Sequence, residues 1–82
     1  MHMFKNRSVN GRNNLCGTTV ARLRKERKLS QRMLAEQLQL LGLDVDKNAV
    51  QRIVSGQRFV TDIELLALSR VFSVELCDLV KG

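Results

Sequence analysis

Apolar side chains recur at the three- and four-residue spacing of an α-helix throughout residues 18–79, in five short segments. In the clearest segment, Leu34, Leu38 and Leu41 form one apolar stripe that Gly42 ends. Helix breakers are scarce, because the 82 residues include no Pro and five Gly. A chain of this length forms one domain, and the pattern predicts an all-α domain of five helices.

Capping residues mark the ends of these expected helices. Ser30 and Asp46 are N-cap residue types, Thr61 with Glu64 matches a capping box, and Ser73 is expected to cap the last helix. The five helices should cover about residues 18–28, 31–41, 46–54, 62–72 and 74–79. The fourth is apolar nearly all round, so we expect it to be buried in the middle of the fold or at an interface.

Residues 1–14 show no helical period and are rich in Asn and Arg. We interpret them as a flexible basic N-terminal arm that precedes the folded domain, residues 15–82. Arg7 and Arg12 either enter a DNA minor groove or lie in a solvated tail, and the tail is the expected state. The chain has no apolar leader and no run long enough to cross a membrane, which predicts a cytoplasmic protein with no membrane partner.

Positive charge is concentrated in the first three quarters of the chain. Residues 1–60 carry twelve Lys and Arg against four Asp and Glu, whereas residues 61–82 carry two against four. This asymmetry favours a polyanion such as nucleic acid as the partner. A solvated basic face without a partner is the alternative.

The sequence offers little for catalysis or metal binding. Its single histidine is His2, near the terminus, and Cys16 and Cys77 form no CxxC pair. We expect both cysteines to be small buried apolar groups in a reducing compartment. No motif joins a nucleophile, a base and an oxyanion donor, so we expect neither an enzyme nor a cofactor, metal or small-molecule ligand.

The third segment, residues 46–54, has the most specific polar face: Lys47, Asn48, Gln51 and Arg52. Amides pair with adenine, and Arg or Lys with guanine, in the major groove of double-stranded DNA. Such a helix can therefore read base edges, although any small helix needs a polar solvated face.

Further candidate DNA contacts flank this segment on both sides. The preceding helix begins with Gln31 and Arg32, and a helix N-terminus presents free N–H groups to a phosphate. After the segment, Ser55, Gln57 and Arg58 offer polar groups to the backbone of a duplex.

Residues 21–80 resemble the phage repressor/Cro (XRE-type) helix-turn-helix family. The matching segments are ARLRKERKLSQRMLAEQL, AVQRIVSGQR and DIELLALSRVFSVELCDLV, which follow the family's order of two helices, a recognition helix with its loop, and two final helices. The resemblance implies a lambda-repressor-like domain that binds operator DNA, usually as a two-fold dimer. Two departures stand out: QLLGLDVDKN adds about one helical turn to the second helix or to the link after it, and Val54 replaces an often acidic residue.

Carried over by position, the resemblance implies that Gln31 contacts a phosphate and an outer base of the DNA. It also implies that Lys47 and Asn48 contact base edges. Arg52 would reach a base or a phosphate, and Ala35 would be a small residue where two helices cross. We therefore expect a bacterial or phage-derived, nucleoid-associated regulator of transcription, a repressor acting as a homodimer on a pseudo-palindromic operator. The alternative is an antitoxin- or adaptor-like interaction module that uses the apolar face of the fourth helix. Phe59 either packs on the core or forms a dimer contact.

Overall fold

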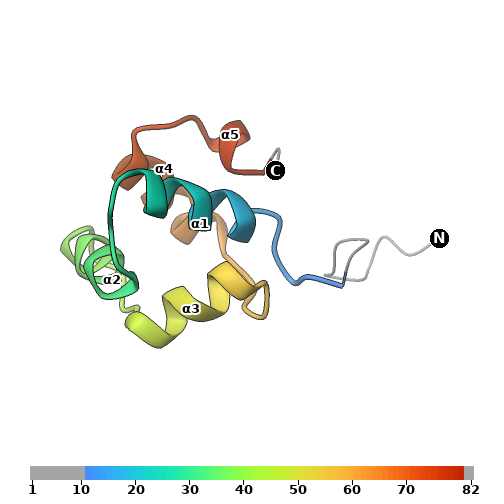
Figure 1. The fold of residues 1–82 in the computed structure, drawn as a ribbon, viewed down its shortest axis with the longest axis horizontal. Coiled ribbons are helices and arrows are strands. Elements are labelled where there is room, and N and C mark those ends of the chain that lie inside the picture. The colour runs from blue at the N-terminus through green and yellow to red at the C-terminus, as the bar shows by residue number, and fades with distance from the viewer. Residues whose placement is uncertain (1–10, 81–82) are drawn as a thin grey trace.

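The computed structural model describes residues 11–80, which form five α-helices and no strands (Figure 1). The helices are α1 (Gly17–Glu26), α2 (Gln31–Leu40), α3 (Lys47–Ser55), α4 (Asp62–Phe72) and α5 (Leu76–Val80). The predicted all-α fold is confirmed, and every predicted helix boundary agrees with the structure within two residues. The spacing of apolar residues was therefore sufficient to place each helix.

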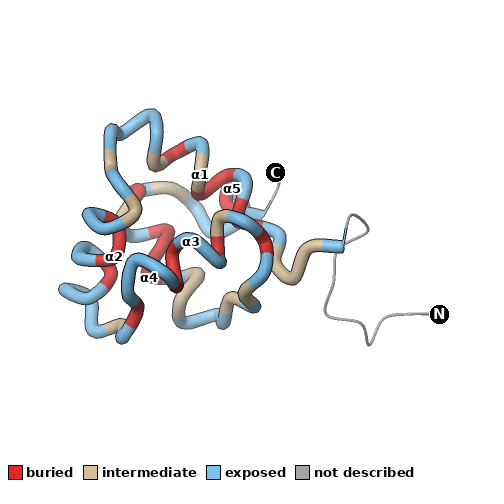
Figure 2. The backbone as a smooth tube through the Cα atoms, turned by 60° about the horizontal axis from the view of Figure 1, so that its bottom comes forward, coloured by how far each residue is buried: buried red, intermediate tan, exposed pale blue. Residues whose placement is uncertain are grey.

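The helices enclose one apolar core. Its largest fully buried side chains come from all five helices and include Val20, Leu34, Ile53, Phe72 and Leu79. α3 contacts both α1 and α2, while α4 contacts α2 and α5. In Figure 2 the buried positions of these helices line the inside of the bundle, so α3 has one face in the core and one in solvent.

Side-chain caps fix the starts of three helices as predicted. The Ser30 hydroxyl accepts from the Met33 N–H at the start of α2, and the Asp46 carboxylate accepts from the Ala49 N–H at the start of α3. Thr61 and Glu64 form both halves of a capping box at the start of α4. Each cap satisfies a backbone donor that the helix itself leaves without a partner.

The predicted role of Ser73 is wrong. Ser73 has a φ of 55° and ends α4 in the left-handed conformation, rather than capping α5. In this conformation the Val74 N–H donates to the Ser69 carbonyl and completes the end of α4. α5 begins later in the chain, at Leu76. The N–H of Glu75, the residue just before it, donates to the Asp78 carboxylate.

The fold does not bury α4 on every side, so the expectation that it lies in the middle of the fold is wrong, whereas its place at an interface stays a prediction. Ala67, Leu68 and Phe72 are in the core, but Ile63 is 67% exposed and Leu66 is 42% exposed. The other helices cover only one face of α4, so its opposite apolar face lies in solvent.

The extra residues before α3 lengthen the link and not α2. α2 ends at Leu40, and Gly42 adopts a φ of 94° that turns the chain. The side-chain amide of Gln39 donates to the Val45 carbonyl at 2.8 Å, and the Val45 side chain is buried in the core. The link is thus anchored at Val45, just before the Asp46 cap, which determines where α3 begins.

The expected arm does not continue unchanged to residue 14. Residues 1–10, with Arg7, lie outside the described residues. Arg12 is not in a solvated tail, because its guanidinium donates to the Val54 carbonyl at 2.6 Å. Asn13 and Asn14 also bond backbone atoms at the end of α3 and in the loop after it. We call residues 12–14 the strap.

The two cysteines differ, and the expected burial of Cys77 is wrong. Cys16 is 1% exposed, whereas Cys77 lies on the exposed side of the short helix α5. Burial raises the pKa of the Cys16 thiol to about 11, so this thiol is protonated at neutral pH.

Two glycines with positive φ provide a matched test of the strap. Gly42 and Gly56 have φ of 94° and 85°, but a Cβ on Gly42 meets open space, while one on Gly56 lies 2.7 Å from Arg12 side-chain atoms. Gly42→Ala should cost about 1 kcal/mol from backbone strain alone. Gly56→Ala should cost about 2 kcal/mol, because it also displaces Arg12 from the Val54 carbonyl. Urea denaturation of both variants measures the difference, and equal losses would mean that the Arg12 contact adds no stability.

The cysteines should react at different rates with a thiol reagent at pH 7. The thiolate is the reactive form, so exposed Cys77 should be modified quickly and protonated, buried Cys16 only when the protein unfolds. Counting modified thiols by mass spectrometry, with and without denaturant, checks this expectation. Two rapid modifications of the native protein would contradict the burial of Cys16.

Candidate nucleic-acid interface

The solvent-facing side of α3 carries four of the predicted contact residues. Lys47, Asn48, Gln51 and Arg52 are all exposed. Residues 47 and 51, and residues 48 and 52, are each four apart, so the four side chains cover one face of the helix. The opposite face is buried in the core through Ala49, Val50 and Ile53. The core therefore holds one face of α3 in place, and the amide and cationic side chains of the other face are exposed to solvent.

The start of α2 places Gln31 and Arg32 at the surface near α3. Gln31 is half-buried and Arg32 is exposed. The Ser30 hydroxyl already binds the Met33 N–H, so the helix begins in a fixed geometry. An N-terminal turn of this kind can bind a phosphate through its backbone N–H groups.

The predicted contacts after α3 divide into two kinds. Ser55 and Gln57 are exposed, and the Ser55 hydroxyl donates to the Arg52 carbonyl at 3.2 Å. Arg58 is held differently, because its guanidinium donates to the Glu64 carboxylate at 2.7 Å. The same carboxylate accepts from the Thr61 N–H in the capping box, so Arg58 joins the loop to α4.

The charges on the α3 side remain available to a polyanion. Within residues 11–80, no ion pair involves Arg32, Lys47 or Arg52. α3 itself contains no acidic residue, and the carboxylate of Asp46 is directed to the Ala49 N–H at the helix start. The electrostatics of this face therefore suit a phosphate backbone.

The strap is the feature that the sequence did not predict. Its three residues bond the C-terminal end of α3 and the loop after it, more than 35 residues away in the chain, and Figure 1 shows the blue segment before α1 beside that end. Gly17 permits this approach, since a Cβ there would collide with the Ile53 carbonyl oxygen. A glycine inside the first turn of a helix was the one sequence signal for a close backbone approach at this point. It does not indicate which segment of the chain approaches.

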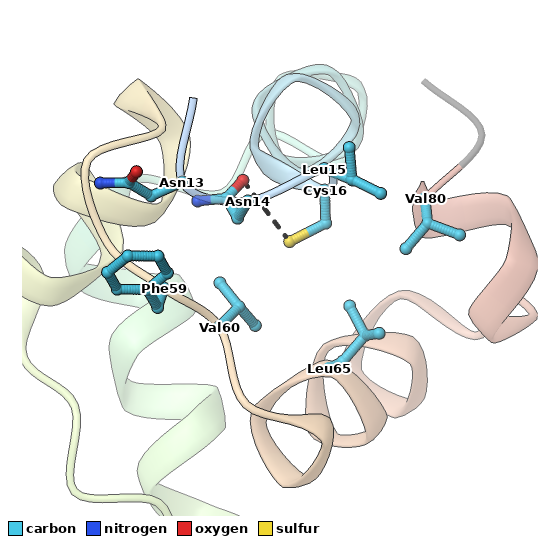
Figure 3. Close-up of a pocket in the computed structure, with 8 residues that line it drawn as sticks. All are labelled: Asn13, Asn14, Leu15, Cys16, Phe59, Val60, Leu65 and Val80. Atoms are coloured by element: carbon cyan, nitrogen blue, oxygen red, sulfur yellow. Dashed lines mark hydrogen bonds between the residues drawn. The ribbon is translucent and has the colours of Figure 1, made fainter. Parts of the chain in front are cut away.

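An apolar hollow of about 290 Å³ lies beside the strap. Figure 3 shows it between the strap, the loop that carries Phe59 and Val60, Leu65 of α4, and Val80 of α5. Phe59 is 54% exposed at its edge, so it does not pack into the core. Inside the hollow, the Cys16 thiol contacts the Asn14 side-chain oxygen at 3.9 Å. Exposed Leu15, Phe59 and Val80 form an apolar rim around the hollow.

Two features of the described residues bear on other classes of function. Within residues 11–80, no group of three or more His, Cys, Asp or Glu side chains is arranged to hold a metal ion. None of the helices in that part of the chain is long and apolar enough to cross a membrane.

Comparison with known proteins identifies the family. No curated protein and no solved structure matches the chain. A helix-turn-helix family model matches residues 20–79, which span α1 to α5 except for the first turn and the last residue. This match covers well over half of the 82 residues and confirms the resemblance seen in the sequence. The chain therefore belongs to the XRE-type helix-turn-helix family of phage repressors and Cro, a family of DNA-binding regulators.

Proposed function

We propose that the protein is a cytoplasmic, sequence-specific repressor that binds a pseudo-palindromic operator as a homodimer. The observation that carries this proposal is the exposed face of α3, where Lys47, Asn48, Gln51 and Arg52 stand on a helix anchored by its buried face. A helix fits the major groove, and these side-chain types form the base contacts that discriminate between base pairs. Occupancy of the operator would exclude the polymerase, and no chemical step is needed.

The α2 start would hold the duplex while α3 reads it. Gln31 and Arg32 would bind phosphates on one side of α3, and Ser55 and Gln57 would bind them on the other. Arg58 stays a predicted phosphate contact, with its guanidinium shared between DNA and Glu64. Because such contacts release counterions, affinity should fall steeply as salt rises.

The exposed apolar rim supports a second copy of the chain as the dimer partner. Leu15, Phe59 and Val80 are exposed around the 290 Å³ hollow, and the Phe59 loop follows α3 directly. A two-fold axis through this rim, parallel to the direction in which the exposed face of α3 points, would place two α3 helices on the same side of the dimer. Two half-sites about 34 Å apart require that arrangement.

A separate observation supports a protein-interaction module as the second candidate function. Exposed Ile63 and Leu66 of α4 border a small hollow of about 100 Å³, together with Leu41, Leu43 and Arg70. An antitoxin- or adaptor-like role would use this face for a protein partner, with DNA contact secondary.

The decisive variant removes two cations from α3. We expect Lys47→Ala with Arg52→Ala to weaken binding to an operator, selected from a random duplex library, by about 100-fold or more, since each good base contact contributes about 1–3 kcal/mol. The control, Lys25→Ala with Arg70→Ala, removes the same charge from exposed positions on α1 and α4. Fluorescence anisotropy at fixed salt measures all three proteins.

The control variant should lose less than about tenfold, through long-range electrostatics alone. Equal losses in the two variants would show that net charge and not the α3 face determines binding. A library that yields no enriched sequence would contradict the regulator proposal and favour the α4 face as the functional surface.

A further inference from the structure

The strap supplies donors to backbone carbonyls at and beyond the end of α3. The Asn13 N–H donates to the Gly56 carbonyl at 2.7 Å, and its side-chain amide donates to the Gln57 carbonyl at 2.9 Å. Arg12 donates to the Val54 carbonyl at 2.6 Å. The last carbonyls of a helix have no partner within it, so the strap provides bonds that water would otherwise make.

Asn14 connects three parts of the fold. Its side-chain nitrogen donates to the Ile53 carbonyl at 3.0 Å and to the Arg58 carbonyl at 2.8 Å. Its side-chain oxygen accepts from the Gly17 N–H at 2.8 Å. One half-buried amide therefore ties the start of α1 to the last turn of α3 and to the loop that leads to α4.

These bonds constrain the direction of α3 at its C-terminal end. The αL conformation of Gly56 ends the helix, and Val54 is only half-buried. At the other end Asp46 and buried Val45 fix the helix start. Without the strap, the last turn of α3 would be restrained mainly by Ile53.

We propose that the strap, chiefly through Asn14, is a positioning element that sets the DNA sequence discrimination of α3. The side chain of Asn14 acts through the α3 backbone, and the proposal rests on the proposed function, because it assumes that α3 reads bases. Base readout requires side chains placed to a fraction of an ångström, whereas phosphate contacts tolerate small shifts. Loosening the strap therefore weakens operator binding more than binding to random DNA.

The substitution Asn14→Ser isolates this role without changing charge. A serine hydroxyl can still accept the Gly17 N–H, as Ser30 does for the Met33 N–H three residues on, but it cannot supply the two amide donors. Ser69→Ala is the control, because it removes one side-chain bond to the Leu66 carbonyl within α4. Urea denaturation first establishes that each variant folds.

If Asn14→Ser does not fold, Asn13→Ala takes its place in the experiment. This variant loses only the side-chain bond from Asn13 to the Gln57 carbonyl.

In Asn14→Ser, the operator Kd should rise about tenfold and the Kd for random duplex less than twofold, because base contacts carry the discrimination. The slope of log affinity against log salt should be unchanged, since no phosphate contact is lost. Ser69→Ala should leave both Kd values as in the wild type. A parallel fall in affinity for both DNAs, or a shallower salt slope, would overturn the proposal.

Amide hydrogen exchange of the free protein provides a readout that needs no DNA. The amides of Gly56, Gln57 and Arg58 should exchange about tenfold faster in Asn14→Ser than in the wild type, because the loop loses its anchor. Unchanged exchange would overturn the proposal even if DNA binding fell. Failure of the wild type to prefer the operator over random DNA would instead contradict the proposed function.

Discussion

Burial of one side of α3 is the interaction on which the interface depends. Val50 and Ile53 are almost fully enclosed by the core, and this packing turns the opposite face of the helix to solvent. Burying such side chains contributes about 1.5–3 kcal/mol each, more than the roughly 0.5–1.5 kcal/mol of a hydrogen bond between neutral groups. The caps and the strap then adjust a helix whose rotation is already fixed. The exposed amides and cations are thus placed by side chains that never contact DNA.

Much of this arrangement could be predicted, because it is encoded locally. Apolar spacing located each helix, and Ser30, Asp46 and Thr61 marked three helix starts through bonds that span three residues. The polar face of α3 followed from the same periodicity. The strap could not be predicted, since Asn14 bonds carbonyls 39 and 44 residues away, and no local pattern specifies such a pairing.

The remaining errors concern residues whose type suits more than one position. Ser73 is a residue type expected at a helix start, but it ends α4 in a left-handed conformation instead. Cys77 is a residue type expected in a core, but it lies on the exposed side of α5. The apolar residues of α4 suggested burial in the middle of the fold or at an interface, and the other helices of residues 11–80 leave Ile63 and Leu66 exposed. The uncovered side is the second apolar surface, with Ile63 and Leu66, and it competes with α3 as the candidate functional surface.

A backbone amide NMR titration with short duplex DNA at low salt identifies the surface of the protein that binds DNA. Binding through α3 predicts that the largest chemical-shift changes occur in the exposed residues of α3 and at the start of α2, with smaller changes in Gln57 and Arg58. Changes centred instead on Ile63 and Leu66 of α4, or changes spread evenly over all basic residues, would contradict it.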